Sequence, residues 1–100
     1  MLQEFIARNE NDEDGNPSGG HVSATGLEID WQNGPLERSL DRAPANGVFV
    51  ETVITAALQR LEYYQSTKFS CRENAIAIMK LEEALHWLES RTKNRETRQV

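Results

Sequence analysis

The sequence predicts an α+β fold, with an N-terminal β hairpin followed by a long antiparallel two-helix hairpin, in a chain that assembles as a homo-oligomer. Turn-forming residues separate β-type segments in the first third of the chain, and apolar residues recur at helical spacing in the second half. The chain has 100 residues, of which 38% are hydrophobic and 27% charged. It therefore suits a single domain over residues 1–100 with one modest core, which self-association would stabilise.

The β-hairpin segment covers residues 1–35. Residues 3–9 and 21–32 have the composition of strands, and the turn formers between them, at 12–20, indicate a loop. The spacing of Asp12, Asp14 and Asn16 resembles a calcium loop, but the terminal bidentate glutamate is missing, so we interpret it as a turn. Pro35 then ends the second strand.

A connector over residues 36–47 precedes the helical hairpin of residues 48–95. Pro44 and Gly47 oppose helix formation in the connector, and Asn46 is a candidate N-cap for the helix that follows. That helix is predicted from residue 48 to about residue 65. Its apolar residues at helical spacing are Val50, Ile54, Ala57, Leu58 and Leu61.

A second helix is predicted over residues 71–93, and the short link before it favours antiparallel packing. Ser70 and Glu73 have the spacing of a capping box at its start. One seam of this helix comprises Asn74, Ile78, Leu81, Leu85 and Leu88. Ile76, Met79 and Trp87 lie elsewhere, so the apolar surface exceeds what one partner helix covers. Met79 and Trp87 could be buried either under the β hairpin or against another subunit.

Charge and hydropathy exclude several classes of partner. The net charge of −5 argues against binding a long nucleic acid. No apolar run approaches the ~20 residues that span a bilayer, and the opening residues lack a secretory pattern, so we expect the protein to stay where it is made, away from membranes. The last ten residues nevertheless form a local anion-attracting site with four basic side chains: Arg91, Lys93, Arg95 and Arg98.

The sequence predicts neither a catalytic site nor a metal site. It contains no G-x-S-x-G elbow, and Cys71, His21 and His86 do not have the spacing of zinc ligands. We interpret Cys71 as a small buried residue rather than a reactive thiol. The expectation is a protein that is not an enzyme and has no cofactor.

Phosphate binding is the chemical function for which the sequence offers the most suitable residues. Arg91 and Arg95 are four residues apart, so on a helix they share a face and could grip a diphosphate through two guanidinium groups. The alternative is that they compensate the dipole at the C-terminal end of the helix.

The link between the helices carries a second set of candidate binding residues, suited to stacking on a nucleobase, although ordinary packing at a helix corner is the alternative. These residues are Tyr63, Tyr64, Phe69, Arg72 and Asn74. Asn74 and Arg91 are seventeen residues apart, about 25 Å along one helix. One dinucleotide-sized ligand can therefore contact both sets only if the link of one subunit meets the helix end of another.

Two motifs in the helical half carry a family resemblance: C-R-E-N-A at 71–75 and L-E-E-A-L-x-W-L-x-x-R-T-x-x-R at 81–95. The stretch 69–95 closely resembles the helical-hairpin domain shared by two kinds of phage anti-defence sponge, the Thoeris inhibitors and the anti-CBASS cyclic-oligonucleotide binders. The motifs D-G-N-P-x-G-G at 14–20 and I-D-W-Q-x-G-P-L at 29–36 look like those of the Thoeris anti-defence protein one type.

The resemblance implies a sponge, in the host bacterial cytoplasm, that binds glycocyclic ADP-ribose without cleaving it and so blocks Thoeris immunity. Carried over by motif, the ADP-ribose pocket uses Tyr64 as a stacking aromatic and Asn74 as a hydrogen-bonding group. Arg91 and Arg95 take the phosphates. The relatives are homo-oligomers, some of them hexamers.

Some relatives have a second kind of pocket that takes cyclic di- or trinucleotides. The resemblance assigns Arg72 to it, with Arg38 or Arg42 as a further arginine from upstream. Two alternative functions stay open. One is a sponge for cyclic oligonucleotides only, and the other is a helical protein-interaction module that docks through Trp87 and Ile76.

Overall fold

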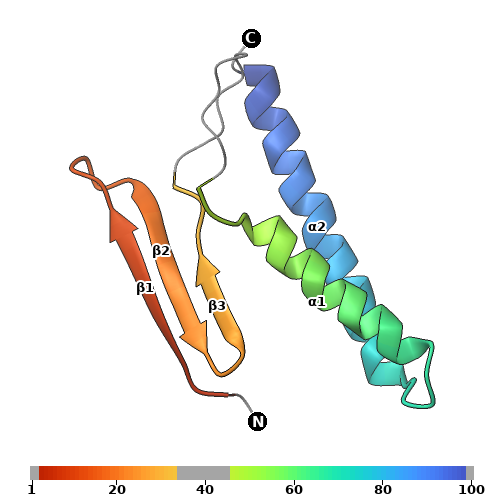
Figure 1. Ribbon diagram of the computed structural model, residues 1–100. Helices are drawn as coiled ribbons and strands as arrows, with labels where there is room; N and C mark the ends of the chain where they lie inside the picture. The colour runs from red at the N-terminus through yellow and green to blue at the C-terminus, as the bar shows by residue number, and fades with distance from the viewer. Residues whose placement is uncertain (1–2, 34–45, 99–100) are drawn as a thin grey trace. The chain divides into compact units, whose positions relative to one another are not determined.

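The computed structural model describes residues 3–33 and 46–98, with side chains up to residue 94 (Figure 1). Three strands precede two helices: β1 (Phe5–Asn11), β2 (Pro17–Ala24), β3 (Leu27–Asp30), α1 (Val50–Gln65) and α2 (Arg72–Arg98). The chain divides into two compact units, Met1–Val50 and Glu51–Val100, and each is described by itself. The predicted α+β class, a small antiparallel sheet followed by two helices, is confirmed.

The sheet has the antiparallel order β1-β2-β3 and one strand more than the predicted hairpin. The stretch expected to be one strand, residues 21–32, turns back at Thr25 and Gly26, so that Ala24 pairs with Leu27. Gly26 has a φ of 78°, a conformation that side chains with a Cβ rarely adopt. In the sequence, this turn is therefore indicated only by one glycine within a run of strand-forming residues.

The two faces of the sheet differ in polarity, because residues directly opposite on paired strands share a face. One face is mainly apolar and includes Phe5, Ala7, Val22, Ala24, Leu27 and Ile29. Ile29 is the buried hydrophobic residue of the described chain, with 9% of its surface exposed. The opposite face is mainly polar and includes Ile6, Arg8, Glu10, His21, Ser23, Glu28 and Asp30.

The loop between β1 and β2 is a turn closed by Asp12, as predicted. The Asp12 carboxylate oxygen Oδ1 accepts hydrogen bonds from the backbone N–H groups of Asp14 and Asn16, both at 2.9 Å. Gly15 occupies the left-handed region with a φ of 83°. The Asp12 carboxylate is thus engaged in closing the turn.

Residues 46–48 return to the end of β3 and close the first unit. Gln32 N–H donates to the Val48 carbonyl at 2.9 Å, and Val48 N–H donates to the Asp30 carbonyl at 2.8 Å. Asn46 Oδ1 accepts from Asn33 N–H at 2.7 Å. The prediction that Asn46 caps the first helix is therefore wrong: α1 begins at Val50, and the Asn46 side chain binds the chain leaving β3 instead.

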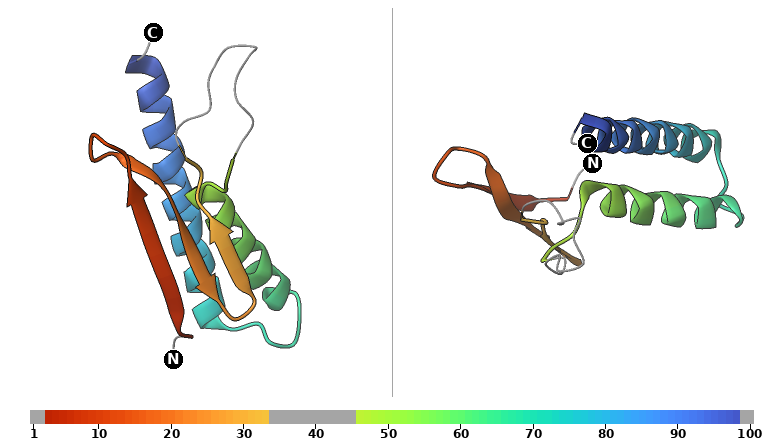
Figure 2. Two further views of the ribbon diagram at one scale, coloured as in Figure 1. Left: turned by 60° about the vertical axis from the view of Figure 1, so that its left-hand side comes forward. Right: turned by 90° about the horizontal axis from the view of Figure 1, so that it is seen from above.

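The two helices run antiparallel side by side (Figure 2). On α2 the predicted seam is half-buried: Asn74, Ile78, Leu81, Leu85 and Leu88. On α1 the predicted Ile54, Leu58 and Leu61 form a half-buried seam together with Gln65, whereas the predicted Val50 and Ala57 are exposed. No α1 side chain is fully buried. The helix α2 extends five residues beyond the predicted end, because the sequence after Lys93 contains no glycine or proline before Arg98.

Candidate functional site

The last turn of α1 presents two tyrosines held by an arginine. Arg60 Nε donates to the Tyr64 hydroxyl at 3.2 Å, and the guanidinium carbon lies 5.1 Å from the ring centroid of Tyr63 and 5.0 Å from that of Tyr64. These distances are within the range of cation–π interactions. The two rings are tilted by 50° with centroids 6.1 Å apart. Half of Tyr63 and 36% of Tyr64 are exposed, so neither residue is covered completely by the contacts with Arg60.

The link between the helices is fixed by side chains that bind backbone groups. Gln65 Oε1 accepts from Cys71 N–H at 2.9 Å, and Gln65 Nε2 donates to the Cys71 carbonyl at 3.2 Å. The Ser66 and Thr67 hydroxyls donate to the carbonyls of Tyr63 and Tyr64, each at 2.6 Å. Hydrogen bonds between Gln65 and Cys71 therefore hold the end of α1 close to the start of α2.

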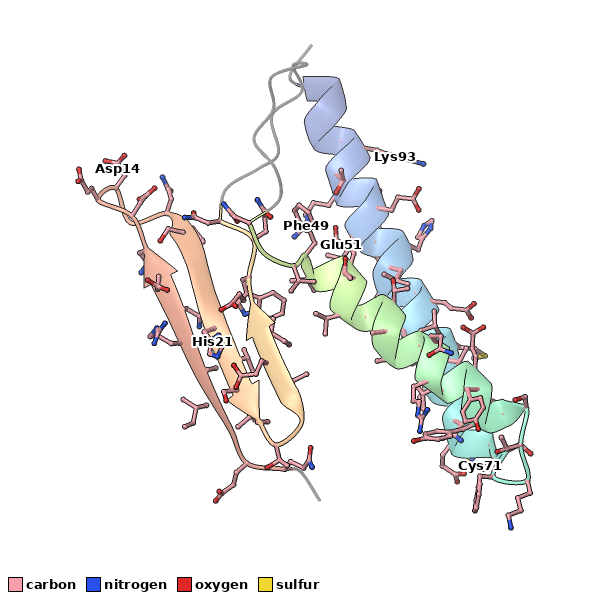
Figure 3. The ribbon with its side chains drawn as sticks, viewed as in Figure 1. Asp14, His21, Phe49, Glu51, Cys71 and Lys93 are labelled. Carbon is pink, nitrogen blue, oxygen red and sulfur yellow. The ribbon has the colours of Figure 1, made fainter. Side chains whose placement is uncertain are left out.

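Asn74 lies in the first turn of α2 and is half-buried. Its Nδ2 group donates to the Phe69 carbonyl at 3.4 Å, and its backbone N–H donates to Cys71 Sγ at 3.4 Å. Cys71 thus occupies the N-cap position, one residue after the predicted Ser70. Cys71 is exposed, which overturns the prediction that it is buried; Figure 3 shows it at the hairpin end.

The structure places Tyr64 and Asn74 at the same end of the helical hairpin but gives them different partners. Tyr64 and its partner Arg60 are exposed residues of α1 that lie outside its half-buried seam. Asn74 belongs to the half-buried seam of α2 and binds the link. Arg72, assigned to the second pocket, is the exposed first residue of α2 and lies at this end too.

The predicted phosphate-binding residues lie at the opposite end of α2. Arg91 is exposed, and Arg95 follows it one helical turn later, although the Arg95 side chain lies outside the described side chains. Lys93, between them, pairs with Glu89 at 3.2 Å. Arg38 and Arg42 lie outside the described residues.

The helix α2 is continuous from Arg72 to Arg98, and this sets the distance between the two ends of the candidate site. The seventeen residues from Asn74 to Arg91 rise about 25 Å. Within one chain, Tyr64 and Asn74 therefore cannot share a ligand of dinucleotide size with Arg91. Both sets of side chains can contact the same ligand only if they come from different chains.

A second apolar stripe runs along α2, roughly opposite its half-buried seam. Ile76, Met79 and Trp87 form this stripe, and 60% of Met79 and 64% of Trp87 are exposed. Glu83 lies on the same line of the helix. The exposed apolar stripe is the kind of surface that soluble chains cover by association.

The polar face of the sheet holds an ion-pair cluster that sequence reasoning missed. His21 Nδ1 lies 2.7 Å from Asp30 Oδ1, and Nε2 lies 3.0 Å from Glu28 Oε2. The hydrogen bond to Asp30, followed by the negative charges of Asp30 and Glu28, raises the pKa of His21 above 6.5. The signal was present, because a turn at Gly26 brings alternate residues of 21–30 to one face.

None of the helices in the described part of the chain is long and apolar enough to cross a membrane. The His, Cys, Asp and Glu side chains of the same part form no group of three that could hold a metal ion.

Comparison with known proteins places the chain in a family. It is similar to Thoeris anti-defense 1 of Bacillus phage SBSphiJ7, with 49% identity over 72 residues, which are 72% of this chain and 48% of that protein. The chain thus spans about half the length of that relative. Residues 23–93 match the family described as Acb2/Tad1, hairpin domain, a stretch that includes both helices up to Lys93 and three of the four predicted ADP-ribose-pocket residues. The resemblance found from the motifs is confirmed: this chain belongs to the Acb2/Tad1 hairpin domain family.

Proposed function

We propose that this protein is a phage anti-defence sponge that binds glycocyclic ADP-ribose in the host bacterial cytoplasm and holds it without cleaving it, which blocks Thoeris immunity. The observation that carries the proposal is the 49% identity to a Thoeris anti-defence protein over 72 residues, together with the match of residues 23–93 to the hairpin-domain family. A bound signal is withdrawn from its effector by mass action, so the inhibition needs a tight site and no catalysis.

The proposed pocket combines the two ends of the hairpin from different copies. Tyr64 stacks on the adenine and Asn74 donates or accepts a hydrogen bond, while Arg91 and Arg95 of another copy bind the diphosphate. The length of α2 supports this division, since about 25 Å separate Asn74 from Arg91 in one chain. The pocket is therefore incomplete in a monomer.

Assembly follows from the exposed apolar stripe of α2. Ile76, Met79 and Trp87 provide apolar surface on the side of the helix that its own partner does not cover. We propose a homo-oligomer, with six subunits as in some members of the family. A member of that oligomer contributes both a Tyr64 end and an Arg91 end, so every helix serves two pockets.

A second pocket, for cyclic di- or trinucleotides, is proposed around Arg72 with Arg38 or Arg42. The exposure of Arg72 at the start of α2 supports its availability to a ligand. Its position away from Arg91 means that the two ligand types would not compete for the same arginines.

Calorimetry with purified protein and glycocyclic ADP-ribose tests the proposal. We expect binding that is roughly ten- to a hundredfold weaker in Arg91→Ala, because the substitution removes a charge-assisted hydrogen bond to phosphate. Lys80→Ala removes the same charge from an exposed position on α2 and is the matched control. Heating the complex should release the ligand intact.

Each of the other possible results would indicate a different function. An altered ligand after release would show an enzyme and overturn the proposal. No heat with glycocyclic ADP-ribose but binding of cyclic di- or trinucleotides would show a sponge for cyclic oligonucleotides only. No binding of either ligand would favour a helical protein-interaction module, whose binding would depend on Trp87 and Ile76 rather than on the arginines.

A further inference from the structure

Arg60 is the basic residue of α1, and its surroundings are unusual for an exposed helical arginine. Such residues commonly pair with an acid three or four positions away. At those positions Arg60 has Ala56 and Ala57 before it, and Tyr63 and Tyr64 after it. Its polar and π interactions along the helix are therefore directed to the two tyrosines.

The contacts of Arg60 restrain the ring of Tyr64 at two points. The Nε group holds the phenolic oxygen at 3.2 Å, and the guanidinium carbon lies 5.0 Å from the ring centroid. The same guanidinium contacts Tyr63 at 5.1 Å, which ties its own position to a second ring. A ring held at its hydroxyl and by a cation has fewer orientations than a free tyrosine of the same exposure.

We propose that Arg60 is a positioning residue of the nucleotide pocket: it holds the Tyr64 ring in the orientation that stacks on the base. The inference rests on the proposed function, because it assigns Tyr64 to the ligand. It adds a residue that neither the family match nor the motifs assign to the site. Arg60 acts through Tyr64, by ordering the ring before the ligand arrives.

Ring ordering before binding can be measured in the free protein. In NMR spectra, Arg60→Met should shift the Tyr64 ring signals and increase the mobility of the ring, while Lys80→Met, which removes the same charge from α2, should not. Tyr64→Phe identifies the signals of Tyr64, and circular dichroism should show unchanged helix content in every variant. Tyr64 signals that do not respond to Arg60→Met would overturn the inference.

Calorimetry with glycocyclic ADP-ribose tests the consequence for binding. Arg60→Met should weaken binding about five- to tenfold, the effect of ordering one or two side chains on association. Arg60→Lys, which keeps a cation beside the rings, should recover part of the loss. In a Tyr64→Leu background, Arg60→Met should cause no further loss, because its effect passes through the missing ring.

Failure of the inference is distinguishable from failure of the proposed function. If the wild type does not bind the probe, the proposed function fails and the role of Arg60 fails with it. If the wild type binds and Arg60→Met binds equally well, only the role of Arg60 is overturned. An equal loss in the Tyr64→Leu background would show that Arg60 contacts the ligand itself, which would also overturn a positioning role.

Discussion

The side-chain amide of Gln65 holds both backbone polar groups of Cys71, accepting from its N–H at 2.9 Å and donating to its carbonyl at 3.2 Å. Gln65 is the last residue of α1 and Cys71 directly precedes α2. This pair therefore fixes the end of the hairpin at which Tyr64 and Asn74 lie. The amide supplies both a donor and an acceptor from one side chain, which a carboxylate of the same length cannot do.

Gln65→Ala should lower the free energy of unfolding by about 1–2 kcal/mol through loss of these two bonds. Gln65→Glu keeps the acceptor but loses the donor, so it should cost less than Gln65→Ala. Chemical denaturation followed by circular dichroism measures both. Equal stability of the wild type and Gln65→Ala would show that the bonds contribute nothing.

The two ion pairs that His21 forms with Asp30 and Glu28 should make the sheet more stable when the imidazole is protonated than when it is neutral. Hydrogen bonding to Asp30 raises the pKa of His21 above 6.5, so the protonated imidazole stabilises the fold. That contribution is fully present below the unfolded pKa of 6.5 and is lost as the pH rises through the folded pKa. The other charged group opposite His21, Arg8 on β1, pairs with Glu10 at 3.8 Å.

Hydrogen exchange of the β2 and β3 amides measures this dependence. Protection should be highest below pH 6.5 and should fall as the pH rises above that value in the wild type, after correction for intrinsic exchange rates. His21→Gln should remove the pH dependence, and His86→Gln, which changes a histidine on α2, is the control. A wild type whose protection does not change over this range would contradict the prediction.

Loss of the Trp87 side chain should weaken self-association. Trp87 is the largest and most exposed residue of the stripe on α2, and truncating a central aromatic of an interface commonly costs about 2 kcal/mol or more. Trp87→Ser should therefore shift the sedimentation of the protein toward the monomer. Glu83→Gln alters the same line of the helix without removing apolar surface and should leave the assembly intact, whereas an unchanged mass for Trp87→Ser would exclude this stripe as the interface.

Gly47→Ala should destabilise the first unit by about 1–3 kcal/mol through overpacking. A Cβ at this position would lie 2.5 Å from the backbone carbon and oxygen of Trp31, and backbone cannot yield as the tip of a side chain can. Gly15→Ala tests the opposite case, since nothing lies within 4 Å of its Cβ position and only its positive φ opposes the substitution. Thermal unfolding should rank Gly47→Ala as the less stable variant.

The two helices could be predicted from the sequence because the periodicity of apolar residues indicates where each helix lies. Apolar spacing located both helices, and the seam around Leu81 and Leu85 is the half-buried one. The errors lie at the ends of elements, where one hydrogen bond decides: Asn46 binds Asn33 instead of capping α1, and Cys71 caps α2 in place of Ser70. The third strand was missed because Gly26 is a weak turn signal among strand formers.

The candidate site was predictable only in part. Tyr64, Asn74 and Arg91 were identified from residue types and family motifs, and the structure adds which of them lie at the same end of α2. The role of Arg60 was not predictable, because cation–π geometry depends on side-chain conformation and no spacing rule requires it. The His21 cluster depended on a register that the two-strand prediction did not contain.

The bonds between residues 32–33 and residues 46–47 consist largely of contacts made by side-chain amides. Asn33 N–H donates to Asn46 Oδ1 at 2.7 Å, and Asn46 Nδ2 donates to the Asn33 carbonyl at 3.1 Å. Gln32 Oε1 accepts from the N–H groups of Asn46 and Gly47, at 3.0 and 3.2 Å. The chain that leaves β3 and the chain that enters α1 are therefore held together by two amides, and a carboxylate in place of the Asn46 amide would lose the donor to the Asn33 carbonyl.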